Sequence, residues 1–166
     1  MRTTIRLTRP RTSAIIFFTC GLWLLVLGLY FALLRPALLP EDLRYIGGSA
    51  GLERVSLPGL ERWLHRVFVA MGGFIAACGV LTTFLAVSAV AERRARTGVV
   101  LCLVGLTTVA TMSWTNFVIE SDFKWLLLAP TALWAAGIAA YAFEGRKTRN
   151  VEAPRRDTFA AFRSSP

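Results

Sequence analysis

Four long stretches of this chain contain no Asp, Glu, Lys, Arg or His, and this absence restricts the possible folds more than any other feature. The stretches cover residues 14–34, 67–91, 98–119 and 125–143. The hydrocarbon core of a bilayer is about 30 Å thick and takes about 20 helical residues to cross. Lipid cannot satisfy backbone polar groups, and the alternating pattern of barrel strands is absent, so each stretch is predicted to be a helix. We therefore predict an all-α integral membrane four-helix bundle.

The composition agrees with this fold class. Of the 166 residues, 55% are hydrophobic and only 17% are charged, whereas soluble domains contain about 25% charged residues. The mean hydropathy is +0.54. These values disfavour a soluble enzyme, a nucleic-acid-binding module and a disordered regulator. We divide the chain into a basic N-terminus (1–13), a four-span domain (14–143) and a basic tail (144–166), and we expect disorder in the distal part of the tail.

The first stretch resembles a secretory signal in one respect, because four arginines precede it. The apolar region of a signal peptide is about 7–15 residues long and ends at a small-residue cleavage site. This stretch runs to Leu34 and is followed by Arg35 and Pro36. We therefore predict that it is retained as a membrane span.

The distribution of charge predicts the orientation of the spans. The N-terminus, the 92–97 connection and the tail together hold 13 Lys and Arg against 4 acids. The opposite side, residues 35–66 and 120–124, holds 6 of each. The side with excess positive charge faces the cytoplasm in most membrane proteins, so both termini are predicted to be cytoplasmic. Arginines far outnumber lysines, as in GC-rich bacterial genomes, and we therefore expect the bacterial inner membrane.

Short connections and small side chains predict how the spans pack. The 92–97 and 120–124 connections predict that the second, third and fourth spans are antiparallel neighbours. Small residues recur on one face of the second span (Gly72, Ala76, Gly79, Thr83, Ala86) and of the fourth span (Ala129, Ala132, Ala136, Ala140). Such faces allow helices to approach closely in lipid, so we expect both to point inward. The first span is bulkier and is expected to be the most lipid-exposed.

Residues 35–66 form the only substantial segment between spans on the outer side. Pro40 is predicted to begin a short helix with Glu41 and Asp42 in its first turn. Pro58 is predicted to begin an amphipathic helix that continues into the second span. Trp63 lies on the apolar face of this helix and His65 on its polar face. We consider these two residues a candidate outer interface at the level of the lipid headgroups.

The residues available for chemistry are few. All three cysteines lie inside spans and form no paired motif, and a single histidine cannot build a bis-histidine haem site or a His-rich metal site. We therefore predict no cofactor and no metal, and we favour a non-enzymatic protein. Four carboxylates (Glu41, Asp42, Glu120, Asp122) could approach one another on the outer side, but Arg44 and Lys124 could pair with them, and we expect a solvated turn.

One polar set near the outer end of the third span forms a candidate pocket. Asn116 is predicted to lie one turn below the membrane surface, where an unpaired amide is unfavourable. Thr131 of the fourth span lies at a similar depth and is its expected partner. The candidate pocket consists of Thr111, Trp114, Thr115, Asn116, Asp122 and Thr131. An interhelical polar clamp is the alternative interpretation of the same residues.

Three hypotheses about function follow. The first is a non-enzymatic membrane protein that acts by association with itself or with another membrane protein, with the lipid bilayer as its other partner and without nucleic acid. The second is a small channel or facilitator with a route lined by threonines of the third span and Asn116. The third is an enzyme that acts at the outer headgroup layer through His65 and nearby acids.

Overall fold

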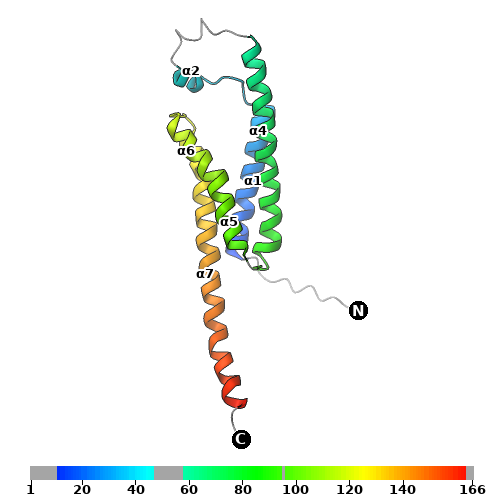
Figure 1. Cartoon of the computed structure of the whole chain (residues 1–166), viewed down its shortest axis with the longest axis vertical. Coiled ribbons are helices and arrows are strands. Elements are labelled where there is room, and N and C mark those ends of the chain that lie inside the picture. Colours follow the sequence, from blue (N-terminus) through cyan, green and yellow to red (C-terminus); the bar gives the residue numbers. More distant parts are fainter. Residues whose placement is uncertain (1–10, 47–57, 95, 164–166) are drawn as a thin grey trace, which may run out of the picture.

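The computed structural model describes residues 11–46, 58–94 and 96–163, and every element in these ranges is helical. The elements are α1 (Thr12–Leu33), α2 (Pro40–Ile46), α4 (Pro58–Leu85), η1 (Ala86–Val90), α5 (Thr97–Gly105), η2 (Leu106–Ala110), α6 (Thr111–Val118) and α7 (Lys124–Arg163) (Figure 1). The elements η1 and η2 are wide π-helical turns: η1 continues α4, and η2 joins α5 to α6. The prediction of an all-α four-helix bundle is confirmed.

Four helical segments are long and apolar enough to cross a membrane. They are Thr12–Leu33, Gly59–Val90, Thr97–Val118 and Lys124–Arg146. Each overlaps one predicted span, and the second begins earlier than its apolar stretch because the amphipathic segment joins it without a break, as predicted. This architecture is that of a multi-pass membrane protein.

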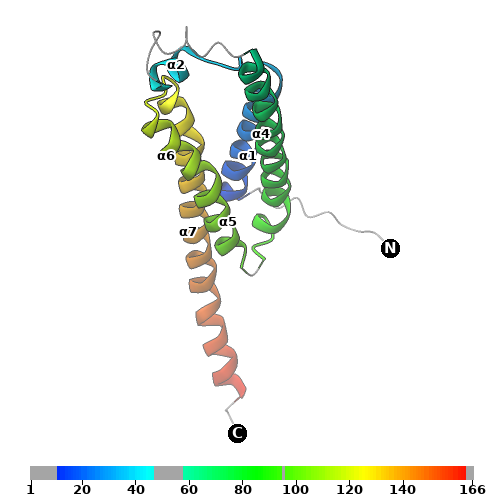
Figure 2. The same ribbon diagram turned by 45° about the horizontal axis from the view of Figure 1, so that its top comes forward.

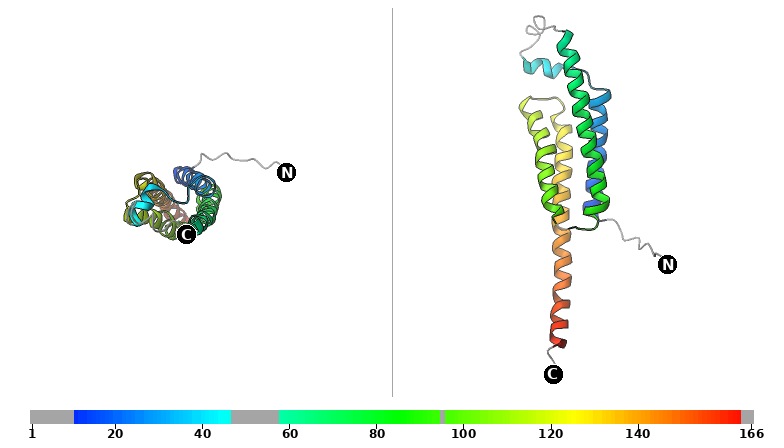
Figure 3. Two further views of the ribbon diagram at one scale, coloured as in Figure 1. Left: turned by 90° about the horizontal axis from the view of Figure 1, so that it is seen from above. Right: turned by 45° about the vertical axis from the view of Figure 1, so that its right-hand side comes forward.

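The four long helices pack as two pairs. α4 runs along α1, and α5 and α6 run along α7, while α1 also contacts α7 and so joins the two pairs. Seen along the long axis, the helices form an open arc (Figure 3). The expectation that the second and third spans pack as neighbours is therefore wrong. The short connection brings their ends together, but the helices diverge because α4 matches α1 better than it matches α5.

Glycines at matching intervals explain why α4 packs on α1. Gly21 and Gly28 are seven residues apart on α1, and Gly72 and Gly79 are seven residues apart on α4. A Cβ atom on Gly72 would lie only 2.6 Å from the carbonyl oxygen of Gly28, and one on Gly79 would lie 2.7 Å from that of Gly21. The expectation that α1 is the most lipid-exposed span is therefore wrong, because its two glycines let the α4 backbone approach.

Phe17 of α1 and Trp134 of α7 form the centre of the core. Phe17 is fully buried, and its ring meets the Trp134 ring edge to face at 5.3 Å. The Trp134 indole lies over Gly105 and donates a hydrogen bond of 2.9 Å to the carbonyl oxygen of Leu101. This arrangement also corrects the alanine face predicted for the fourth span: Ala132 and Ala136 are exposed, because the indole turns the opposite side of α7 inward.

The third long helix buries every fourth residue. Its buried residues are Thr97, Leu101, Gly105, Val109 and Ser113. A spacing of four drifts around an α-helix, which has 3.6 residues per turn, but a π-turn holds more residues per turn and reduces this drift. The wide turn η2 thus keeps one continuous side of the helix against α7.

Two helices extend beyond the bundle at opposite ends (Figures 1 and 2). The ring of Phe68 lies beside that of Phe31 near the end of α1, so residues 58–67 of α4 project past α1 by about 15 Å. At the other end α7 remains helical to Arg163, whereas disorder was expected there. Once a helix is nucleated, each further residue adds a hydrogen bond, and this favours continuation of α7 beyond its apolar part.

Candidate functional site

Three of the six residues of the predicted polar pocket lie on the exposed side of α6. Thr111, Trp114 and Thr115 are exposed, and Trp114 is 72% accessible. The hydroxyl groups of Thr111 and Thr115 donate to carbonyl oxygens of their own helix, those of Leu106 at 2.9 Å and Thr111 at 3.0 Å. These contacts give the exposed threonines a structural explanation, and a polar route along them stays a prediction.

Asn116 and Thr131 are not hydrogen-bonded to one another. The Asn116 amide donates to the carbonyl oxygen of Met112, one turn earlier, at 2.9 Å. The Thr131 hydroxyl lies 2.7 Å from the Ser113 hydroxyl and donates to the carbonyl oxygen of Val109 at 2.8 Å. An interhelical polar clamp therefore exists between α6 and α7, and Thr131 shares it with Ser113, which precedes Trp114, Thr115 and Asn116 in the sequence but is not one of the six predicted pocket residues.

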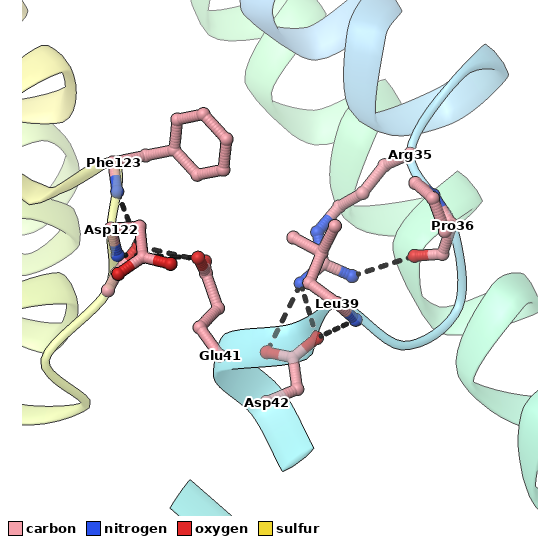
Figure 4. A network of polar contacts seen from close by, with 8 residues as sticks. Arg35, Pro36, Leu39, Glu41, Asp42, Asp122 and Phe123 are labelled. Atoms are coloured by element: carbon pink, nitrogen blue, oxygen red, sulfur yellow. Dashed lines mark hydrogen bonds and ion pairs between the residues drawn. The ribbon is translucent and has the colours of Figure 1, made fainter. Parts of the chain in front are cut away.

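At the end of the bundle that carries α2, a buried carboxylate connects α2 to α7. Glu41 is only 7% exposed, and Figure 4 shows it pointing from α2 to the turn before α7. It accepts hydrogen bonds from the Ser121 hydroxyl at 2.9 Å and from the Asp122 backbone N–H at 3.3 Å. Because α7 begins three residues after Ser121, the carboxylate lies at the positive end of a long helix, where a negative charge is stabilised.

A second acid of α2 connects the same helix to the linker that follows α1 (Figure 4). Asp42 accepts a hydrogen bond of 2.8 Å from the Leu39 backbone N–H and forms an ion pair of 3.1 Å with Arg35. The Arg35 guanidinium also lies over the Phe68 ring, 3.6 Å from its centre. α2 therefore bridges the two helix pairs through two adjacent acids.

A cavity and an exposed ion pair also lie beside α2. A cavity of about 170 Å³ lies between α2, α4 and the end of the third long helix. Its lining residues are Ala37, Leu38, Glu41, Asp42, Tyr45, Leu64, Phe68 and Ile119. Arg44 forms an ion pair of 2.6 Å with Asp122, one of the pairings expected from the sequence, and the hydrogen bond and charge of Asp122 raise the pKa of Arg44 above its ordinary value.

The candidate outer interface lies on the projecting part of α4. Trp63 is 61% exposed and His65 is exposed, while Leu64 between them lines the cavity under α2. In the ranges that the structure describes, no three His, Cys, Asp or Glu side chains are grouped so that they could hold a metal ion.

The opposite end of the bundle, here called the arginine end, holds Arg11, residues 91–94, Arg96 and residues 144–146. The Glu144 carboxylate accepts hydrogen bonds from the backbone N–H and the hydroxyl of Ser13, at 3.1 and 2.7 Å. Arg93 lies 3.7 Å from the same carboxylate and stacks over the Tyr141 ring at 4.2 Å. This junction was not predicted, and the one local signal for it is an acid, Glu144, directly after the last apolar stretch and before Arg146 and Lys147.

The exposed side of α4 is the remaining candidate for a functional surface. It lies opposite the side that packs on α1 and has small residues at its centre, Ala70, Gly73 and Ala77, all exposed. A Cβ atom on Gly73 would have no neighbour within 4 Å. Large apolar side chains flank these positions, including Phe74 (75% exposed), Leu81 and Phe84.

Comparison with known proteins identifies no relative. No family model matches the chain, and neither a curated protein nor a solved structure is significantly similar to it.

Proposed function

We propose that this protein is an integral membrane protein that acts by association, with a second copy of itself or with another membrane protein, and not by catalysis. The proposal places it in a bacterial inner membrane with both termini in the cytoplasm. The four long apolar helices support membrane insertion, and the uneven distribution of Lys and Arg supports the orientation.

The exposed face of α4 is the observation that carries the proposal. Within a membrane, helices gain little by hiding apolar side chains from lipid, and they associate where small residues let backbones approach. The packed face of α4 uses Gly72 and Gly79 in this way against α1. The exposed face presents Ala70, Gly73 and Ala77 in a comparable row, but no helix of the described chain covers them.

Gly73, the glycine in this row, is not required by any close contact within the described chain. A glycine in a helix destabilises it by about 1 kcal/mol relative to alanine. At Gly72 close contact with α1 compensates for this loss, whereas at Gly73 an alanine would meet nothing. A partner helix packed on this face would give Gly73 the role that Gly72 has on the other.

The test compares oligomeric state in lipid. The full chain is reconstituted at low density, and subunits are counted by single-molecule photobleaching or by cross-linking. The double variant Gly73→Leu, Ala77→Leu fills the row with large side chains, so we expect association to weaken about tenfold or more, in line with the 1–3 kcal/mol effect of overpacking. Resistance to unfolding should stay the same, because both positions are exposed.

The matched control is Ala135→Leu, Ala139→Leu, which adds similar volume to exposed positions of α7. This variant should associate like the unchanged protein. A strictly monomeric wild-type chain with no co-purifying membrane protein would contradict the proposal, and so would unchanged association of the Gly73, Ala77 variant.

A further inference from the structure

The arginine end carries more positive charge than its own acids can pair. Among the described residues it holds five arginines (Arg11, Arg93, Arg94, Arg96, Arg146) and two acids (Glu92, Glu144). Arg93 pairs with Glu144, and Arg94 pairs with Glu92 at 2.8 Å. No ion pair within the described part of the chain joins an acid to Arg11, Arg96 or Arg146.

Three of these arginines lie in the three segments that meet at one junction. Glu144 binds Ser13 and lies beside Arg93. Arg11 precedes Ser13 by two residues, and Arg146 follows Glu144 by two residues. The chain before α1, the turn after η1 and α7 therefore each supply an arginine at this end of the bundle, with Arg93 beside the Glu144 carboxylate and Arg146 over the Phe143 ring at 5.9 Å.

Arg11 has a donor that the described residues leave without an acceptor. Its Nη1 atom is buried and makes no hydrogen bond to any residue in these ranges. A buried guanidinium N–H without an acceptor is unfavourable by about 1–3 kcal/mol or more. The group would be satisfied by an anionic oxygen from outside the described chain.

The α2 end differs in its balance of charge, although Arg62, Arg66 and Lys124 also form no ion pair within the described residues. Arg35 and Arg44 at that end are each paired with an acid. Its described basic residues (Arg35, Arg44, Arg62, Arg66, Lys124) equal its described acids in number (Glu41, Asp42, Glu61, Glu120, Asp122). The charge surplus is therefore specific to one end of the bundle.

We propose that the arginine end binds the phosphate of an anionic membrane phospholipid through Arg11, Arg93 and Arg146. The inference rests on the proposed insertion in a membrane. The apolar helices begin at Thr12 and end at Arg146, which places the cluster at the level of the lipid headgroups. The planar guanidinium group offers paired donors that fit phosphate oxygens, and the Tyr141 ring under Arg93 holds one of them in place.

The experiment measures lipid selectivity of the full chain. The protein is purified in a mild detergent, and phosphatidylglycerol or phosphatidylcholine is titrated while bound lipid is counted by native mass spectrometry. The wild type should retain phosphatidylglycerol preferentially. Each arginine removed in Arg11→Gln and Arg146→Gln should weaken this binding about fivefold, because a basic residue near an anionic surface contributes about 1 kcal/mol.

The matched control, Arg44→Gln with Arg62→Gln, removes the same charge from the α2 end and should leave the preference unchanged. Equal loss in the control would overturn the proposal, and so would full retention of phosphatidylglycerol by the Arg11, Arg146 variant. Displacement of the lipid by inorganic phosphate or an acidic peptide at equal concentration would also overturn it in favour of a soluble anion. Failure of the chain to remain in carbonate-washed membranes would instead refute the proposed membrane insertion itself.

Discussion

Both faces of α4 have small residues along their middle, but one face packs on α1 and the other is exposed. One face places Gly72 and Gly79 against the backbone of α1, and the other leaves Ala70, Gly73 and Ala77 exposed. Residue size alone does not distinguish them. The packed face has a partner whose own glycines recur at the same interval of seven, so the two helices can touch at two successive levels. A row of small residues becomes an interface only where a second helix matches its spacing.

The largest effect is expected where the packed face is blocked. In Gly72→Leu the new Cβ atom would lie only 2.6 Å from the carbonyl oxygen of Gly28. Backbone cannot give way as a side chain does, so we expect the free energy of unfolding to fall by about 3 kcal/mol or more. Gly73→Leu, one residue away, should leave it almost unchanged. Unfolding in mixed detergent and SDS, followed by circular dichroism, measures both, and equal effects would remove the distinction between the faces.

A smaller effect is expected from truncating large side chains. Phe17→Ala removes a fully buried ring that packs on Trp134, whereas Phe74→Ala removes one that is 75% exposed. Lipid is as apolar as the core, so only the unfilled cavity counts, and we expect a loss of about 2–3 kcal/mol for Phe17→Ala. Phe74→Ala should change stability by less than about 0.5 kcal/mol. The same unfolding assay compares them, and a large loss for Phe74→Ala would show that its face is already covered by a partner.

The smallest effect is expected in α2, which also has a buried side, with Glu41, and an exposed side, with Arg44. Glu41→Gln keeps the shape of the buried side chain but removes the negative charge that faces the start of α7, so we expect a loss of about 1–2 kcal/mol. Arg44→Gln breaks an exposed ion pair and should change stability by about 0–1 kcal/mol. Hydrogen exchange of the residues around Ser121 reports the loosening of α2 directly. Faster exchange in Arg44→Gln than in Glu41→Gln would contradict this ranking.

The sequence predicts the elements of this fold better than their contacts. The four spans and the start of α2 at Pro40 are correct because crossing lipid excludes charge over about 20 residues, and proline marks the first turn of a helix. The burial of α1 is missed because it depends on a match between two glycine pairs far apart in the chain. The inward side of α7 is missed because one indole ring that fits over Gly105 outweighs a row of alanines.

The polar contacts show the same limit. The approach of the 120–122 turn to α2 is anticipated, but its form is a serine bound to a single buried glutamate. The Asn116 amide donates to the carbonyl oxygen of Met112 in its own helix, not to a residue of α7. Whether such an amide bonds within its helix or to a neighbouring helix depends on side-chain geometry, which the residue type alone does not reveal. The junction of Ser13 with Glu144 joins residues 131 positions apart, and no local pattern connects them.

The link between Ser13 and Glu144 has a consequence for biogenesis. Ser13 lies at the beginning of the first helix and Glu144 at the end of the last apolar segment, so the ribosome completes almost the whole membrane domain before the two can meet. Until then the amino end of α1 lacks its carboxylate acceptor. The bundle therefore closes at this end late in synthesis. In a chain truncated before the final helix, the start of α1 would enter the membrane without its contact to Glu144.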